Sequence, residues 1–537
     1  MKPRKTSSSF ASFWLGAGML LAGASITPAL AQNTALQPAA PVRFAVKGFS
    51  VDGENPLGAT RTATLLAPFA RDDATLDTLQ QAAAALEAAL RDAGFGLYRV
   101  ALQPQEVGQT VKLSVVHFVV GSVAVEGASQ YDAANIRRSL PELREGATPN
   151  FRRLAIQTAI ANENPGKQTQ VGLRESESAD RVEATVLVKE GRPLSVSAGV
   201  NNTGTAETGR DRSTIALTHA NVFKLDHQFS AAFTTSFANP SRVKQFGASY
   251  RAPFYAAGGV LGASLTRSDV VGNFGSFSST GAGHTFGVNY THYLPPEKGY
   301  RSYVTLALDD KVFDPTQING QSVVGQVVRR SRQLSLAYAG RRDADAALWS
   351  YSAEFATNLG GGSGNRLAAY QTEDPRIQTA RWKALRANAT YVGNTRNHWQ
   401  MVWRSALQYS PDALIAAEQF GLGGASSVRG TAERPIAGDR GLLTSLEMLS
   451  PDLQPGLRGL AFLDAGWLSN VNSNGGSKPS SDQLASTGMG LRYVSQAISV
   501  SAEYGRLIRG SKVPLSLNSA APQKGDQKLH LQLTARF

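Results

Sequence analysis

The chain has 537 residues, of which 42% are hydrophobic and 18% charged, and its formal net charge is +13. This composition excludes an intrinsically disordered chain, and the lack of any eighteen-residue apolar run after the extreme N-terminus excludes a bundle of membrane-spanning helices. No run of five or more Lys/Arg residues occurs either, so the charge favours an anionic membrane face or a basic lumen over nucleic acid.

The N-terminal segment predicts export. Basic residues between Lys2 and Lys5 precede the apolar stretch FASFWLGAGMLLAGASI, and the small-residue pattern ALA follows it. This is the pattern of a secretory signal peptide over residues 1–31, with a retained membrane anchor as the alternative. No cysteine occurs in the sequence, which fits an exported protein that is stabilised without disulfides. Residues 32–41 are predicted to be a short linker.

Residues 42–190 combine strand patterns with helix patterns. The stretch VRFAVKGFSV alternates like a strand, and TLDTLQQAAAALEAALRDAGF is an amphipathic helix that ends at Gly94. The apolar face of this helix comprises Leu76, Leu79, Ala83, Leu86 and Leu90. Strand-like LYRVAL and VKLSVV follow, and the same order then recurs. The sequence therefore predicts two β-α-α-β-β units, over residues 42–117 and 118–190.

From residue 193 to residue 537 the helical patterns disappear. Sixteen segments of roughly ten residues alternate apolar and polar side chains, from LSVSAGV to KLHLQLTARF. Tilted strands between lipid and a polar lumen need this alternation, and a bilayer requires the sheet to close. Short turns such as SQA alternate with long polar loops such as GGGSGNRLAAYQTEDPR, which a soluble sandwich or propeller does not explain. We predict a transmembrane β-barrel of about 16 antiparallel strands, preceded by two periplasmic α/β domains.

The sixth long connection, FGLGGASSVRGTAERPIAGDRG at residues 420–441, is too rich in glycine to be a strand and too long for a turn. Its glycines allow it to fold back into a crowded lumen. An arginine at its tip, Arg429, then needs a carboxylate partner. Asp464, in the thirteenth strand, can supply this partner if Phe462 and Gly466 share its face.

Two alternatives stay open for this arginine. It can be exposed in a mobile loop, or it can pair within its own loop with Glu433 or Asp439. The sequence of the loop alone does not choose among these arrangements.

The ensemble of features resembles the two-partner secretion transporters, which are the TpsB family of haemolysin or filamentous-haemagglutinin secretion/activation proteins. The motifs that carry this resemblance are Val428-Arg429-Gly430, Phe462-x-Asp464-x-Gly466 and Gly490-x-Arg492-Tyr493. The stretches LREGATPNFRRLAIQTAIANENPGKQTQV and NNTGTAETGRDR and the terminal Phe537 are similar to the family as well. The resemblance covers roughly residues 42–537.

The resemblance implies that the α/β units are POTRA domains, which capture an unfolded, adhesin- or haemolysin-like exoprotein in the periplasm. The barrel, in the outer membrane of a Gram-negative bacterium, would conduct this passenger outward, with Arg429 locked to Asp464. Phe537 would be the C-terminal signal for the barrel assembly machinery. Thr431 stands where the family usually has an aromatic residue, so different packing beside Arg429 is expected. Residues 32–41 do not suggest a plug helix.

Nothing in the sequence indicates catalysis. The motifs H-E-x-x-H and G-x-S-x-G are missing, and NPGKQT has Ala161 and Gln168 where a phosphate-binding loop needs glycine and Ser or Thr. We expect no enzyme activity, cofactor, metal or nucleic-acid partner. A barrel-assembly factor of the same superfamily and a passive porin are the alternative functions. We also expect the passenger to add as a strand to TQVGLR and VEATVLV, taken as edge strands of the second unit.

Overall fold

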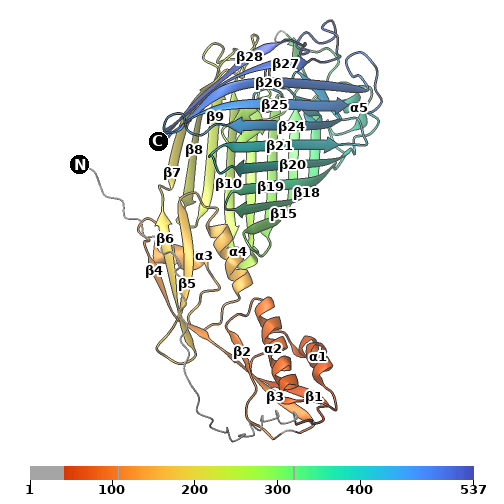
Figure 1. The fold of residues 1–537 in the computed structure, drawn as a ribbon. Helices are drawn as coiled ribbons and strands as arrows, with labels where there is room; N and C mark the ends of the chain where they lie inside the picture. The colour runs from red at the N-terminus through yellow and green to blue at the C-terminus, as the bar shows by residue number, and fades with distance from the viewer. Residues whose placement is uncertain (1–41, 107, 319–320) are drawn as a thin grey trace, which may run out of the picture.

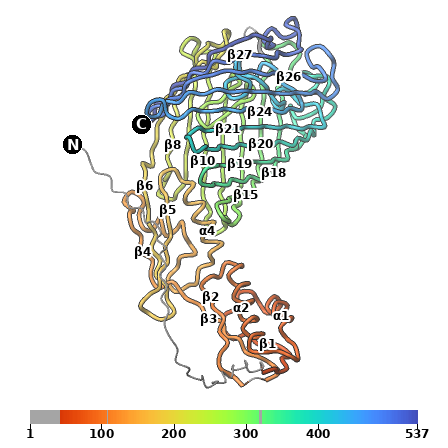
Figure 2. The backbone as a smooth tube through the Cα atoms, in the orientation of Figure 1, coloured from red at the N-terminus to blue at the C-terminus, as the bar shows by residue number. Residues whose placement is uncertain are grey.

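The computed structural model describes residues 42–106, 108–318 and 321–537. The predicted signal peptide and linker lie outside these residues. Two small α/β units follow one another below one end of a closed barrel, and the chain ends beside the first barrel strand (Figure 1). The backbone trace shows the same order, with the first unit farthest from the barrel (Figure 2).

The first unit is a three-stranded sheet covered by helices. Its elements are β1 (Gly48–Asp52), α1 (Ala59–Leu66), the 3-10 turn η1 (Ala67–Phe69), α2 (Leu76–Asp92), β2 (Tyr98–Ala101) and β3 (Thr110–His117). The sheet order is β1-β3-β2, with β1 parallel to β3. Thr75 caps α2 by accepting the N–H of Thr78, and Gly94, at φ +98°, follows its end. The predicted apolar face is buried except for Leu76, which is 59% exposed in the first turn of the helix.

The second unit repeats this design. Its elements are β4 (Val119–Glu126), α3 (Ala133–Ser139), α4 (Phe151–Ala161), β5 (Lys167–Glu175) and β6 (Arg181–Glu190). The sheet order is β4-β6-β5, because β6 pairs with β4 in parallel and with β5 in antiparallel register. The expectation that VEATVLV is an edge strand is therefore wrong. It forms the central strand β6, while TQVGLR, in β5, does lie at an edge.

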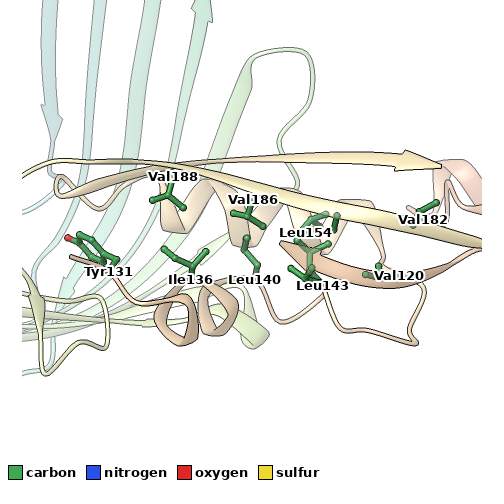
Figure 3. Close-up of a cluster of buried hydrophobic side chains, with 11 residues drawn as sticks. Val120, Tyr131, Ile136, Leu140, Leu143, Leu154, Val182, Val186 and Val188 are labelled. Atoms are coloured by element: carbon green, nitrogen blue, oxygen red, sulfur yellow. The ribbon is translucent and has the colours of Figure 1, made fainter. Parts of the chain in front are cut away.

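The core of the second unit lies between its helices and the sheet (Figure 3). Ile136 of α3, Leu140 directly after that helix and Leu154 of α4 lie across from the valines of β6. Every second residue of β6 from Val182 to Val188 is buried, as expected for a strand with one face on a core. Each fully buried aliphatic side chain contributes about 1.5–3 kcal/mol to stability.

The barrel contains sixteen antiparallel strands, each paired with its neighbours in chain order, and β28 closes it against β7. The strands are β7 (Leu194–Asn201), β8 (Arg212–Val222), β9 (His227–Thr235), β10 (Gln245–Phe254), β11 (Gly259–Ser268), β14 (Gly283–Tyr293), β15 (Tyr300–Phe313), β18 (Arg329–Ala344), β19 (Ala347–Asn358), β20 (Lys383–Asn394), β21 (Gln400–Tyr409), β24 (Arg440–Leu449), β25 (Leu457–Ser469), β26 (Ser481–Val494), β27 (Ile498–Arg509) and β28 (Gln527–Arg536). This confirms the predicted fold class.

The two faces of the barrel wall differ in polarity. Large apolar side chains such as Leu306, Leu308 and Leu463 are exposed on the outer surface, whereas alternate residues such as Glu447 and Asp464 are buried and polar. An apolar exterior and a polar interior are what a membrane barrel requires. The wall therefore presents charged groups to any segment that enters the lumen.

Short elements occupy several connections. They are η2 (Tyr255–Ala257), β12 (Gly272–Phe274), β13 (Phe277–Ser279), β16 (Gln317–Ile318), β17 (Gln321–Ser322), α5 (Leu367–Gln371), η3 (Ala416–Glu418), β22 (Phe420–Leu422) and β23 (Ile436–Gly438). The last two form a hairpin at the two ends of loop six. The expectation that residues 420–441 contain no strand is therefore wrong at their edges, because antiparallel pairing of the two ends satisfies their backbone groups.

Candidate functional site

Loop six, residues 420–441, folds back against the inner wall of the barrel. Apolar side chains of the loop and of the wall form one buried cluster, comprising Leu422, Val428, Ile436, Leu468, Leu484 and Leu507. Val428 is fully buried in this cluster. Gly466 faces the loop, and a Cβ atom built on it would lie 2.6 Å from Leu422 Cδ1. The cluster therefore fixes the loop on both sides of its arginine.

Arg429 lies at the centre of a buried charged network. Its Nε and Nη2 donate to Asp464 Oδ2 and Oδ1 at 2.8 and 2.7 Å, and its backbone N–H donates to Asp464 Oδ2 at 3.1 Å. Its Nη1 donates to Glu447 Oε1 at 2.7 Å and to Glu503 Oε2 at 2.8 Å. A bidentate guanidinium–carboxylate pair fixes both orientation and charge. The structure thus brings Arg429 and Asp464 together, and not Arg429 with its own loop.

A second arginine balances the remaining charge. Arg492 donates through Nε to Glu503 Oε1 at 2.7 Å and through Nη1 to Glu447 Oε2 at 2.9 Å. Arg404 Nη1 also donates to Glu447, at 3.1 Å. Three guanidinium groups therefore face three carboxylates, so the buried charges are compensated.

Small residues and an aromatic ring complete the pocket that surrounds the Arg429 side chain. The guanidinium carbon lies 3.4 Å from the ring centroid of Phe462, which is a cation–π contact. Gly430 has φ +97°, and its N–H donates to His530 Nε2 at 3.1 Å. A Cβ atom at Gly490 would lie 2.9 Å from Glu503 Cγ, so only glycine leaves that carboxylate room beside the arginines.

Two of the predicted site residues lie elsewhere. Tyr493 faces outward from β26 and is 38% exposed. Phe537 has an exposed side chain, and its backbone exchanges hydrogen bonds with Val196 at the start of β7. Glu447 and Glu503 were not predicted as site residues. The alternation of apolar and polar residues in β24 and β27 is consistent with both side chains facing the lumen, but no motif linked them to Arg429.

The loop carboxylates that could have paired with Arg429 have other partners. Glu433 accepts the N–H of Ala425 at 2.8 Å. Asp439 is fully buried and accepts from Arg376 Nη1 at 3.1 Å and from the N–H of Leu414 at 2.9 Å. The contact with Arg376 ties the outer end of the loop to the neighbouring connection between β19 and β20. The loop is therefore held at its tip and at its outer end.

A second buried ion pair joins the second α/β unit to the barrel. We call the four residues Asn135, Lys167, Asp226 and Tyr255 the unit–barrel joint. Lys167 Nζ donates to Asp226 Oδ2 at 2.6 Å and to Asn135 Oδ1 at 2.9 Å, and Tyr255 donates to the same Asp226 oxygen at 2.9 Å. Burial lowers the pKa of Lys167, which the charge of Asp226 opposes. The lysine of the rejected phosphate-loop pattern is therefore structural.

The carboxylate of Glu190 fixes the loop that leads into α3. It accepts hydrogen bonds from the N–H groups of Ser129, Gln130 and Tyr131 and from the Ser129 hydroxyl, at 2.6–2.9 Å. Burial alone would raise its pKa, but these donors lower the pKa of Glu190 to about 2. The end of β6 is thereby tied to the start of the helical layer.

Across residues 42–106, 108–318 and 321–537, no helix combines the length and the apolar character needed to cross a bilayer. The same described part of the chain contains no group of three or more His, Asp or Glu side chains placed to hold a metal ion.

Two α/β units, a sixteen-stranded barrel with an apolar exterior and an arginine-anchored loop in its lumen define a membrane β-barrel protein with attached α/β units. The chain belongs to the haemolysin secretion/activation protein family ShlB/FhaC/HecB, whose model matches residues 182–493, and a ShlB-type POTRA domain model matches residues 44–117. It is thus an outer-membrane transporter of two-partner secretion, with its POTRA region in the periplasm. The identification and location expected from the sequence are confirmed.

Individual relatives agree with this assignment. The outer membrane transporter CdiB of Escherichia coli is 22% identical over 445 residues, which span 79% of this chain and 73% of the relative. The structure of CdiB from Escherichia coli superimposes with a TM-score of 0.71 at 20% identity, covering 95% of this chain and 93% of the other. The structure of CdiB from Acinetobacter baumannii superimposes with a TM-score of 0.69 at 17% identity, covering 93% of this chain and 90% of the other. These likenesses in structure show the shared fold.

Proposed function

We propose that residues 42–117 and 118–190 act as two POTRA domains, which bind an unfolded exoprotein and pass it to a barrel whose lumen is occupied by loop six. The order of the parts supports this proposal, because the two units lie in line below the barrel (Figure 1). The ion pair between Lys167 and Asp226 holds the second unit at the barrel. A passenger leaving its sheet would therefore meet the lumen directly.

The role of loop six rests on the bidentate pair between Arg429 and Asp464. A passenger strand and a loop anchored across the lumen compete for the same space, so release or displacement of the loop would accompany transport. A network of hydrogen bonds in a polar lumen can exchange partners with water, which suits a reversible anchor. This pair is the observation that carries the gating part of the proposal.

The passenger would bind by adding a strand to the free edge of β5. An edge strand presents unpaired backbone groups that an extended chain can bind, whatever its side chains. β5 pairs only with β6, and its residues from Val171 to Glu175 are not buried. The central strand β6 has no free edge, so the proposal is restricted to β5.

The proposed transport role also implies the remaining partners. The passenger is an adhesin- or haemolysin-like exoprotein, outer-membrane lipid surrounds the barrel, and the barrel assembly machinery recognises the terminal Phe537. Transport by this route needs no catalytic residue, cofactor or metal. No nucleic acid takes part.

Crosslinking tests the binding edge, since the native chain has no cysteine. Leu173→Cys on β5 and the matched control Leu187→Cys on β6 both place an exposed thiol on the second unit. Each variant would be co-expressed with an exoprotein encoded by a neighbouring gene. Single cysteines would be introduced into that exoprotein. Crosslinks at position 173 and not at 187 are expected, and equal crosslinking at both would contradict strand addition.

Deletions test the transport role itself. Removal of residues 42–117 or 118–190 should abolish secretion of the exoprotein while the barrel still inserts into the outer membrane. Normal secretion by either truncated protein would rule out the proposed role of that unit. Loss of other outer-membrane barrels from the cells, with the exoprotein still secreted, would instead indicate an assembly factor.

A further inference from the structure

The outer surface of the barrel carries a cluster of basic side chains at the end opposite the POTRA units. The POTRA end is marked by Asn135, which donates to the carbonyl of Lys224 in the turn after β8, and by the turn containing Tyr255. β11 and β15 run away from that end and finish at Ser268 and Phe313. These finishing residues therefore mark the level of the outer leaflet.

The strand register aligns the cluster across four neighbouring strands. In one row it places Arg267 of β11, His284 of β14, Val312 of β15 and Arg330 of β18 opposite one another. In the next row towards the membrane centre, Asp310 lies opposite Arg332. These side chains share the outward face with Leu265, Phe286, Leu308 and Leu334, each of which is 37–52% exposed. An apolar surface therefore continues directly into a basic one.

The cluster carries an excess of positive charge. Arg330 donates through Nε to Asp310 Oδ1 at 2.6 Å and through Nη2 to Oδ2, so one carboxylate holds one guanidinium. Arg332 remains 4.0 Å from Asp310 and is 43% exposed. Arg267 is exposed and has no ion-pair partner among the described residues. Two guanidinium groups are thus available to an anion, and Arg330 keeps a free Nη1.

Guanidinium groups on a lipid-facing wall are costly at the membrane centre and tolerated near its interface. At the interface they attract the phosphate groups of anionic lipids, and their planar fork suits a phosphate better than an ammonium group does. One strand, β15, separates the basic side chain on β14 from those on β18. The two groups therefore lie roughly 10 Å apart at the usual strand spacing. That separation suits two phosphates better than one.

We propose that this surface binds an outer-leaflet lipid that carries two phosphate groups. Arg267 and His284 contact one phosphate, and Arg330 and Arg332 contact the other. The acyl chains lie along Leu265, Phe286 and Leu308. The ion pair with Asp310 holds Arg330 in position and leaves its outer edge for the headgroup.

The test uses the full-length protein in detergent and measures lipid binding by native mass spectrometry, with bisphosphorylated lipid A as the probe. The double variant Arg267→Gln/Arg332→Gln should bind this lipid roughly 30-fold more weakly. Arg342→Gln is the matched control, because Arg342 is an exposed residue on the outward face of β18 at its periplasmic end. The control variant should bind like the native protein.

Three outcomes would overturn the proposal. Unchanged affinity of the double variant would show that the basic row does not hold the headgroup. An equal loss in Arg342→Gln would indicate attraction to the net charge alone. Equal binding of a dephosphorylated lipid, or full competition by inorganic phosphate at matched concentration, would show that acyl chains and phosphates are not recognised together.

Discussion

The barrel lumen and the unit–barrel joint each bury a cation, but they hold it in different ways. Arg429 is 2% exposed and donates to three carboxylates, whereas Lys167 is fully buried and donates to one carboxylate and one amide oxygen. Guanidinium offers five donors in a fixed plane, and ammonium is a compact point charge. The lumen site is a network, and the joint depends on a single ion pair.

This difference decides what each region tolerates. If Arg429 leaves its seat, Arg492 still pairs with Glu447 and Glu503, so two of the three carboxylates keep a cationic partner. If Lys167 is lost, Asp226 keeps no cationic partner among the described residues. We infer that the lumen network is suited to releasing and rebinding loop six. The joint, in contrast, is suited to keeping the second unit fixed against the barrel.

The largest effect is expected from Arg429→Ala. The substitution leaves Asp464 buried without its guanidinium, and breaking a buried pair from one side costs about 3–5 kcal/mol. We expect loop six to lose its seat and secretion to fall severely, while the barrel still inserts. Secretion yield and protease protection of the loop measure the two effects.

Two further variants sharpen this result. Arg429→Lys keeps the charge but not the fork, and it should also fail to seat the loop. Asp464→Ala should be milder than Arg429→Ala, because Arg429 keeps Glu447 and Glu503. The double variant should then be no worse than Arg429→Ala alone, and fully additive losses would show that the pair is not coupled.

The joint gives the next largest effect. Lys167→Met preserves the length of the side chain but leaves Asp226 buried and charged, at a cost of about 3 kcal/mol. We expect the second α/β unit to lose its fixed orientation. Spin labels at Leu187 and Glu297, on the domain and on a barrel turn, should show a broadened distance distribution.

Asp226→Asn combined with Lys167→Met provides the control. The double variant removes both charges and leaves an amide that can still accept from Tyr255, so the distribution should narrow again. A distribution that is unchanged in Lys167→Met would mean that other contacts, such as Arg251 with Glu163, hold the joint.

The two regions also differ in how far the sequence predicted them. Strand alternation predicted all sixteen barrel strands, because lipid on one side and a polar lumen on the other impose it along every strand. The pairing of Arg429 with Asp464 followed from the family motifs. Which inward residues converge on Arg429 depends on the stagger between strands, so Glu447 and Glu503 could not be assigned.

The joint left no signal in the sequence. Lys167 and Asp226 are separated by 59 residues and belong to different parts of the fold. The alternation in VEATVLV shows that one face is buried, but it does not show whether a strand is central or at an edge. The parallel pairing of β4 with β6 decides this, and it depends on the path of the whole unit.

Acid should weaken the second α/β unit, residues 118–190. The four hydrogen bonds to Glu190 lower its pKa from 4.5 to about 2, so their contribution is complete above pH 4.5 and is lost as pH falls towards 2. Glu190→Gln removes the charge and should cost about 2 kcal/mol near neutral pH. Hydrogen exchange at residues 129–131 across pH 2–5 measures the loss.

The native protein and Glu190→Gln should differ in how steeply the exchange protection of residues 129–131 changes with pH. In the native protein, exchange protection of this segment should fall between pH 4.5 and 2, whereas Glu190→Gln should show little change over that window. Parallel curves for the two proteins would mean that another group controls the acid response.

The smallest effect is expected within loop six itself, at Thr431, two residues after the anchoring arginine. The Thr431 hydroxyl accepts the N–H of Gly424 at 2.9 Å, and its one proton can go to the carbonyl of Val428 at 3.1 Å or to that of Ala432 at 3.0 Å. Thr431→Val keeps the shape and leaves that N–H without its partner, at about 1 kcal/mol, while Thr431→Ser retains the hydroxyl. Faster amide exchange at Gly424 and slightly noisier single-channel conductance are expected for valine and not for serine. Because the charged contacts of Arg429 are untouched, secretion should stay close to native in both variants, and a severe secretion defect in Thr431→Val would show that the neutral hydrogen bonds, and not the ion pairs, hold the loop.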